Sequence, residues 1–198
     1  MISDELGIST GNLTYYFPTK EHLLTELVKV LCKFQYETMV KEADDGISEV
    51  LAVCLEFASM MAASEENAAI KDFFLAGYLN PLCLEIIRKN DVERARKVFK
   101  EYCTDWSDEQ YVEAGILVSG IEFGTLMTTD TTVDLEKRIE GALNGILSIY
   151  CVPEEVRKAK IQKALHRNYK ELGRSTLASF KKYAEETNEQ IFMDMLKK

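Results

Sequence analysis

The chain has 198 residues, of which 46% are apolar and 29% are charged, and its formal net charge is −9. This length suits one domain of ordinary size, and the apolar fraction supports a packed core, which excludes a disordered or fibrous protein. No run of residues approaches the roughly 18 consecutive apolar residues of a membrane span, and the first residues lack the pattern of a signal peptide. We therefore expect a cytoplasmic protein with no membrane partner.

The five cysteines lie far apart in the sequence and form no Cys-x-x-Cys motif. An odd number of widely spaced cysteines, most of them in apolar runs, favours reduced thiols in the core over a disulfide framework. The acidic net charge restricts any contact with nucleic acid to a local surface.

Hydrophobic spacing predicts helices along the first half of the chain. Apolar residues three and four positions apart predict a helix over 20–43. Residues 47–63 are apolar on nearly every side except at Glu49 and Glu56, so we expect a buried helix there. Helices over 66–79 and from Pro81 to about residue 103 follow. The apolar stripe changes register at Asn90-Asp91, which allows a break at that point.

The second half of the chain continues the helical pattern. Ser107 and Gln110 have the spacing of a capping box and predict a helix over 108–128. The next apolar stripe covers 134–150, Pro153 opens a further helix that Gly173 is expected to close, and the last helix spans 175–196. Because no alternating strand pattern occurs, the predicted fold class is all-α.

Residues 2–24 have the spacing of a helix-turn-helix. A short helix over 2–6 ends at Gly7, and a second helix over 10–17 follows a turn in which Ser9 is the N-cap. Pro18 ends this second helix, and Thr19 caps the long helix that begins at Lys20. This arrangement lays a second helix in the major groove of DNA.

The segment GISTGNLTYYFPTKEHLL, residues 7–24, resembles the helix-turn-helix of TetR-type (tetracycline-repressor-like) transcriptional regulators. The usual pattern of that family is Gly-Val-Ser-x-Gly-x-Leu-Tyr-x-Tyr-Phe-x-Ser-Lys-Glu-x-Leu. Thr14 stands where tyrosine is common, and Thr19 replaces the serine cap. The resemblance implies a helix-turn-helix DNA-binding region with its connecting helix over 1–43. It also implies an effector-binding and dimerisation domain over 44–198, with extra C-terminal helices.

The same resemblance assigns roles within the segment, position by position. Thr10, Asn12 and Tyr15 would face base edges of operator DNA, whereas Tyr16 and Lys20 would hold phosphates. A surface helix hairpin, with its tyrosine pair packed on a neighbour, is the structural alternative.

The segment departs from the family in one respect, because a first helix normally precedes it. Here Met1 falls at or inside the short helix over 2–6, which corresponds to the second helix of the family. The expected packing partner of Leu13 and Phe17 is therefore missing from the sequence. Either further residues exist upstream, or the product is truncated and binds its operator weakly. The coding sequence upstream of Met1 distinguishes these alternatives.

Bulky apolar side chains and one isolated carboxylate suggest a pocket for a small apolar or aromatic effector. The candidate effector-binding residues are Phe57, Met60, Met61, Phe73, Phe74, Tyr78, Tyr102, Trp106, Glu122 and Phe123. Most of the apolar ones could equally be plain core. Glu122 is the only charge between Ala114 and Thr129, so it must be paired, hydrogen-bonded or protonated if it is buried. It could meet a ligand amine or hydroxyl, pair across a subunit interface, or lie at an edge that touches solvent.

Small residues recur in the expected helices 108–128 and 134–150. Glycine inside a helix costs roughly 1 kcal/mol relative to alanine, so a close approach of backbones is the expected compensation. The resemblance implies that these two helices and their copies form a four-helix bundle in a twofold dimer. The candidate interface residues are Gly120, Gly124, Ala142, Gly145 and Ile146. Tight packing within one chain is the alternative.

The sequence gives little support for an enzymatic function. The chain contains two histidines, and it has no phosphate loop, dinucleotide fingerprint or nucleophile elbow. We therefore expect no enzymatic activity, no metal and no cofactor. The sequence favours a ligand-responsive, dimeric, DNA-binding transcriptional repressor. The alternative is a dimerisation or small-molecule-binding protein that does not bind DNA.

Overall fold

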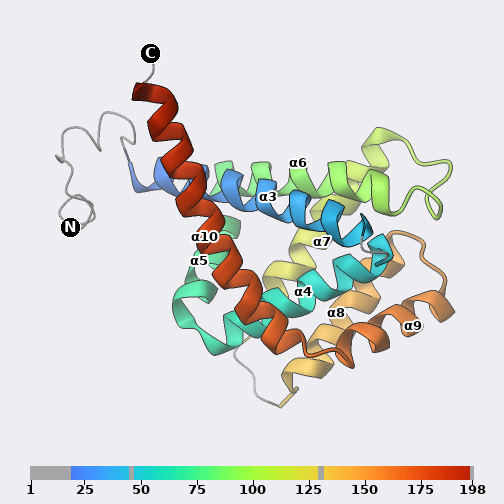
Figure 1. The fold of residues 1–198 in the computed structure, drawn as a ribbon. Helices are drawn as coiled ribbons and strands as arrows, with labels where there is room; N and C mark the ends of the chain where they lie inside the picture. The colour runs from blue at the N-terminus through green and yellow to red at the C-terminus, as the bar shows by residue number, and fades with distance from the viewer. Residues whose placement is uncertain (1–18, 45–46, 129–131, 197–198) are drawn as a thin grey trace.

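The computed structural model describes residues 19–44, 47–128 and 132–196. Within these ranges the chain forms eight helices and no strand, which confirms the predicted all-α fold class (Figure 1). The helices are α3 (Lys20–Asp44), α4 (Glu49–Glu66), α5 (Ala68–Leu79), α6 (Pro81–Val98), α7 (Asp108–Met127), α8 (Leu135–Ile149), α9 (Glu154–Leu165) and α10 (Tyr169–Leu196). None of these helices is long and apolar enough to cross a membrane.

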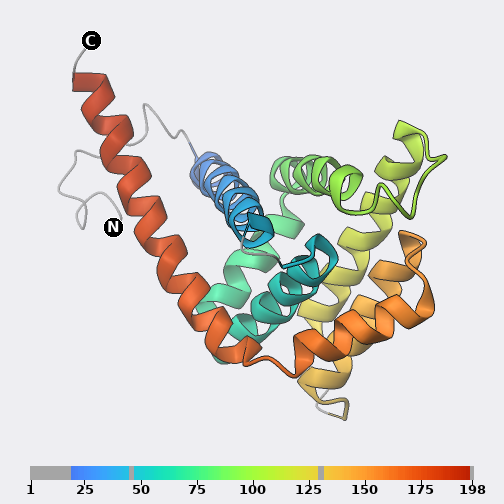
Figure 2. The same ribbon diagram turned by 45° about the vertical axis from the view of Figure 1, so that its right-hand side comes forward.

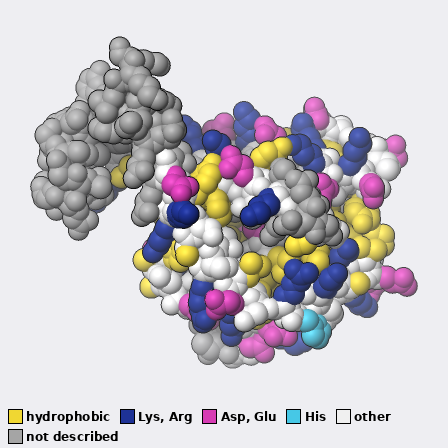
Figure 3. Space-filling view, in the orientation of Figure 1, with side chains coloured by type: hydrophobic (Ala, Val, Ile, Leu, Met, Phe, Trp, Pro, Cys, Tyr) yellow, Lys and Arg dark blue, Asp and Glu magenta, His cyan; other side chains and the backbone are white. Residues whose placement is uncertain are grey.

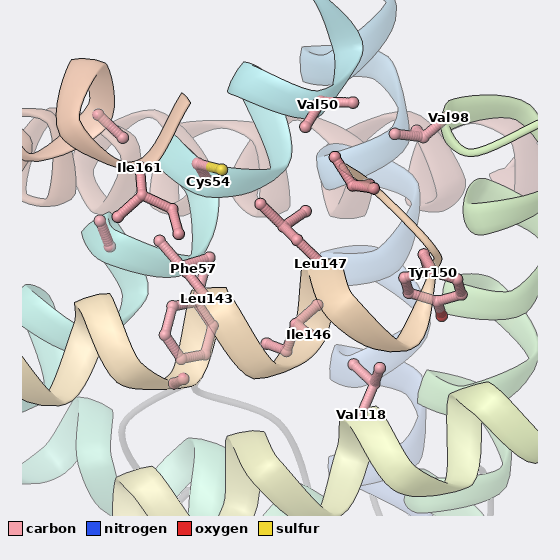
Figure 4. Packing of buried hydrophobic residues seen from close by; sticks show 14 of the residues in the cluster. Val50, Cys54, Phe57, Val98, Val118, Leu143, Ile146, Leu147, Tyr150 and Ile161 are labelled. Carbon is pink, nitrogen blue, oxygen red and sulfur yellow. The ribbon is translucent and has the colours of Figure 1, made fainter. Parts of the chain in front are cut away.

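Helix α4 is the centre of the structure and packs against α3, α5, α8, α9 and α10. Its sequence is apolar around most of the helix, so contact with neighbours on several sides removes that surface from water. Figure 4 shows Phe57 of α4 close to Leu143 and Ile146 of α8, with Val118 of α7 on the other side of α8. The four cysteines in this interior are buried and unpaired, whereas Cys151 is exposed and unpaired.

Capping side chains fix several helix starts where the sequence predicts them. The Ser107 hydroxyl accepts a hydrogen bond from the Gln110 backbone N–H at 3.4 Å. The Gln110 side chain accepts one from the Ser107 backbone N–H at 2.8 Å, which completes the predicted capping box of α7. Asp134 caps α8 by accepting from the Lys137 backbone N–H at 2.8 Å.

Several predicted helix boundaries are wrong. Helix α6 runs unbroken through Asn90-Asp91 and ends at Val98 rather than near residue 103. Asp91 interrupts the apolar stripe without ending the helix, and its carboxylate lies 3.9 Å from Arg94 on the same side of α6. The helix expected to run to residue 173 ends at Leu165, and α10 begins at Tyr169. Gly173 lies inside α10 and ends no helix. A Cβ atom at Gly173 would lie 2.7 Å from the backbone oxygen of Ser59. The glycine therefore serves close packing of α10 on α4, a role that the sequence pattern does not distinguish from a helix C-cap.

Helix α3 packs against α6, α4, α5 and α10, so it is part of the same body as the remaining helices. Val28 and Cys32 of α3 join Cys83 of α6 in a small buried cluster. Phe34 lies between Phe180 and Tyr183 of α10, with ring centroids 5.5 and 5.4 Å away. Figure 2 shows α10 running along one side of the molecule and past the start of α3. The predicted domain division at residue 43 lies one residue before α3 ends.

Candidate ligand-binding cavity

A cavity of ≈ 100 Å³ lies among α3, α4, α5, α6, α7 and α8. Each of these helices contributes a wall because its apolar stripe faces the interior, and most of the lining is aliphatic or aromatic. Tyr150, which follows α8, closes one side and stacks on Phe99 at 4.2 Å between ring centroids. The cavity therefore has the mainly apolar lining that is typical of small-molecule sites.

The cavity gathers five of the ten side chains predicted for an effector site: Phe57, Met60, Phe74, Tyr78 and Glu122. The other five lie elsewhere. Met61 is in the main hydrophobic core, and Tyr102 packs against that core. Phe73 packs against the smaller cluster around Val28. Phe123 is half-buried and lies against Tyr78, at 6.2 Å between ring centroids. Trp106 packs against Tyr111 and Tyr150, one residue removed from the lining.

An arginine–glutamate pair crosses the cavity wall between α6 and α4. Both terminal nitrogens of Arg94 bind the two carboxylate oxygens of Glu56, with a distance of 3.0 Å for the contact to Oε1. Gln35 of α3 donates a further hydrogen bond to Glu56 at 2.8 Å. Only 9% of the Arg94 side chain is accessible, so this bidentate pair is largely shielded from water.

Among the described residues, the other two carboxyl groups of the cavity have no bidentate arginine partner, although Asp91 accepts a hydrogen bond from the Asn90 side chain at 3.3 Å. Glu122 accepts a hydrogen bond from the Tyr78 hydroxyl at 2.7 Å, and Asp91 lies 3.9 Å from Arg94. Burial, with the negative charges of Asp91 and Glu56 nearby, raises the pKa of Glu122 to about 8. Burial likewise raises the pKa of Asp91 to about 6, and the pKa of Tyr78 rises well above its usual value. At neutral pH, Glu122 is therefore largely protonated.

Sequence reasoning predicted Tyr78 and Glu122 but missed the other polar residues of this cavity. Glu56 had a usable signal, because it is one of two charges in the apolar run 47–63. Asp91 was interpreted as part of a helix break, and no spacing rule pairs Arg94 with a residue 38 positions earlier. Long-range pairs of this kind depend on how helices pack, which one sequence does not show.

A second cavity, of ≈ 90 Å³, lies between α10 and the helices α3, α4 and α5. It shares five lining residues with the first cavity: Leu31, Gln35, Glu56, Met60 and Phe74. Ser59 lines the second cavity, is 4% exposed, and its hydroxyl has no hydrogen-bond partner among the described residues. The two spaces are thus adjacent across a common wall, and the second has one unsatisfied polar group.

The residues predicted to contact DNA lie almost entirely outside the described part of the chain. Thr10, Asn12, Tyr15 and Tyr16 precede its first residue, so their predicted roles stay predictions. Lys20 is exposed at the first position of α3.

The predicted interface residues divide into two groups. Gly120 and Gly124 are exposed on α7, and a Cβ atom at either would meet no neighbour within 4 Å. Ala142 and Ile146 are buried, and Ile146 lines the first cavity, so neither presents its side chain to a partner. A Cβ atom at Gly145 would lie 3.4 Å from Ile121 of the same chain. This close neighbour agrees with the alternative prediction, in which the glycine serves tight packing within one chain.

The described residues contain no group of three or more His, Cys, Asp or Glu side chains that could hold a metal ion. Comparisons with protein-family models, with curated proteins and with solved structures find no match to this chain. The geometry of the cavities and the sequence of residues 7–24 are therefore the basis for a function.

Proposed function

We propose that the protein is a ligand-responsive, DNA-binding transcriptional regulator of the TetR type, acting as a repressor. One observation carries the proposal: the segment that resembles a helix-turn-helix, residues 7–24, runs into the start of α3, and α3 also forms a wall of the cavity. Lys20 is the first residue of α3, whereas Leu31, Cys32 and Gln35 line the cavity. A molecule in the cavity therefore contacts the helix to which the DNA-reading segment is joined.

The mechanism is a shift between two orientations of α3. A helix rises about 1.5 Å per residue, so Lys20 and Gln35, which are 15 positions apart on α3, are separated by roughly 22 Å. Gln35 ties α3 to Glu56 through its hydrogen bond, so a ligand that disturbs the Glu56–Arg94 pair changes what holds α3. Effector binding favours the orientation in which the two reading helices of a dimer no longer match successive major grooves.

Twofold DNA recognition requires a dimer, for which α7 offers a surface. Its exposed apolar side chains are Val112, Ile116, Leu117 and Met127, each about half accessible. Gly120 and Gly124, with open space beside them, lie on the same exposed stretch. An apolar surface with small residues permits close contact with a second copy of the helix.

The DNA-binding role is tested in the native host with the protein tagged at its C-terminus and expressed from its own gene. Sequencing of the DNA that co-purifies with it should reveal an inverted repeat. Lys20→Ala should reduce occupancy of all sites and flatten the salt dependence by about one unit, as expected for a phosphate contact. Asn12→Ala should relax preference at one base position in each half-site. Absence of any enriched sequence would refute the repressor function.

A small-molecule-binding protein without DNA binding is the second candidate. Figure 3 shows both Lys or Arg and Asp or Glu side chains over the described part of the face it displays. On α3, Lys29 pairs with Glu26 at 2.6 Å and Lys33 with Glu37 at 3.9 Å. These pairs leave little unbalanced positive charge for phosphates along this helix. Ligand binding without any enriched DNA sequence would favour this candidate.

A further inference from the structure

The charges that line the first cavity do not balance. Its described lining contains three carboxyl groups, those of Glu56, Asp91 and Glu122, and a single guanidinium, that of Arg94. Arg94 is committed to Glu56 by two hydrogen bonds, and its contact with Asp91 is a longer 3.9 Å. Among the described residues, the donor to Glu122 is a neutral one, the Tyr78 hydroxyl. At neutral pH a proton on Glu122 offsets part of this excess of carboxyl groups, and a cation that enters the cavity would take the place of that proton.

The nature of this cation follows from the surroundings. The described residues form no metal-binding group, and the remaining walls are apolar, with the aromatic rings of Phe57 and Phe74 among them. Apolar and aromatic walls suit an organic ammonium group with an attached hydrocarbon body, because such a cation is weakly hydrated and attracted to ring faces.

The second cavity adds an independent observation. The buried hydroxyl of Ser59 lines it and has no partner among the described residues, and a buried polar group without a hydrogen bond is costly to the protein. A ligand oxygen or nitrogen at that position would satisfy the hydroxyl. Met60 and Phe74 belong to the wall common to both cavities. A rotation of these two side chains would join the two spaces.

We propose that the two cavities together bind one elongated organic cation, with its positive centre against Glu122 and Asp91 and a hydrogen-bond acceptor of its body near Ser59. The inference rests on the proposed function in treating the cavities as an effector site, and it specifies the class of effector.

Calorimetry with three probes tests the charge requirement. The probes are hexanoylcholine, the uncharged ester in which carbon replaces its ammonium nitrogen, and hexyltrimethylammonium, which lacks the ester. Hexanoylcholine should bind at least about tenfold more tightly than its uncharged counterpart, because only the cation meets the two carboxylates. Equal affinity of the charged and uncharged esters would overturn the proposal.

Glu122→Gln tests the position of the positive centre. It keeps an acceptor for the Tyr78 hydroxyl but removes the charge, so it should weaken both cations about tenfold and leave the uncharged ester within about twofold. Glu113→Gln is the matched control, since Glu113 is an exposed acid on the same helix α7. An unchanged preference for the cation in Glu122→Gln would place the positive centre elsewhere and refute the assignment. Circular dichroism and thermal melting establish that each variant is folded.

The pH dependence gives a readout that a purely structural role of Glu122 would not produce. The groups around Glu122 are Glu56 on α4, Tyr78 on α5, Asp91 and Arg94 on α6, Cys32 on α3 and Tyr150 after α8. Since Glu122 holds its proton up to about pH 8, a cation must displace that proton to bind. Affinity for hexyltrimethylammonium should therefore rise between about pH 6.5 and pH 8, by up to about tenfold per unit, and then level off. Glu122→Gln should abolish this rise, and a flat profile in the unmodified protein would contradict the proposal.

A pair of serine variants tests the second cavity. Ser59→Ala should weaken hexanoylcholine severalfold and leave hexyltrimethylammonium unchanged, because only the former carries an acceptor for the hydroxyl. Ser64→Ala is the control: its hydroxyl is also buried without a partner among the described residues, but it lines neither cavity. Equal effects of the two variants on hexanoylcholine would exclude Ser59 from the site.

These measurements contain no DNA, so the inference and the proposed function can fail separately. Tight, charge-selective binding by a protein that enriches no DNA sequence would support the inference and refute the repressor. Enrichment of an inverted repeat by a protein that does not prefer the cation would do the reverse.

Discussion

Glu122 combines burial with proximity to other carboxyl groups, and its protonation therefore depends on folding. The folded protein binds this proton up to about pH 8, whereas a glutamate in an unfolded chain releases it near pH 4.5. Because the folded state binds the proton more tightly, the free energy of unfolding falls as pH rises between these values. Asp91 contributes in the same direction but only up to about pH 6.

Glu122→Gln should therefore stabilise the protein at alkaline pH. We expect a gain on the order of 2 kcal/mol in the free energy of unfolding at about pH 8.5 and little change at about pH 5. Urea unfolding at both pH values measures this difference. The control variant Glu113→Gln should show no such pH dependence, and an equal effect of Glu122→Gln at both pH values would contradict the raised pKa.

Among the described residues, three arginine–glutamate pairs connect α4 to other helices: Arg94–Glu56, Arg138–Glu65 and Arg174–Glu66. The first and the last differ strongly in burial. Arg94 binds Glu56 with 9% of its side chain accessible, whereas Arg174 binds Glu66 at 2.9 Å with 60% accessible. Arg94→Ala should lower the free energy of unfolding by roughly 3 kcal/mol, because it leaves Glu56 without its partner in a shielded site. Arg174→Ala should have little effect, since water replaces the partner of Glu66. Urea unfolding measures both variants. Similar losses of unfolding free energy in the two would show that burial does not decide how much an ion pair contributes to stability.

At the scale of elements, the contact between α10 and α4 depends on the absence of a side chain at Gly173. A Cβ atom there would lie 2.7 Å from the backbone oxygen of Ser59, which cannot move without moving α4. Gly173→Ala should lower the free energy of unfolding by about 1–3 kcal/mol through overpacking. Gly77→Ala should be neutral or stabilising by up to about 1 kcal/mol, because its Cβ would meet Ile87 at an ordinary 3.5 Å. Thermal unfolding that ranks the two variants in the opposite order would contradict the close approach.

The helices could be predicted from the sequence because their signals are local. Ser107 with Gln110, and Pro81 after Asn80, indicate helix starts within a few residues. Gly173 shows the limit of such signals, since one residue type serves both a helix end and a helix contact. Part of the cavity lining was also predictable, from the aromatic residues and the isolated Glu122. The pairing of Arg94 with Glu56 was not, because it depends on the angle between α4 and α6.

At the scale of the whole molecule, the proposed dimer can be separated from the fold. Ile116→Glu combined with Leu117→Glu introduces two charges at exposed positions of α7, so it should convert the dimer to a monomer without unfolding it. Leu82→Glu is the control, because Leu82 is equally exposed but lies on α6. Sedimentation velocity distinguishes the states. A dimer that persists in the double variant would exclude this surface of α7.

Trp106 is the only tryptophan of the chain, and its ring packs 6.1 Å from that of Tyr150, a residue of the cavity wall. An occupant that displaces Tyr150 also changes the surroundings of the indole. The emission spectrum of the unlabelled protein should therefore respond to binding, so affinities can be followed by intrinsic fluorescence. Trp106, although it lies outside the cavity, thus provides an intrinsic fluorescent reporter of ligand binding.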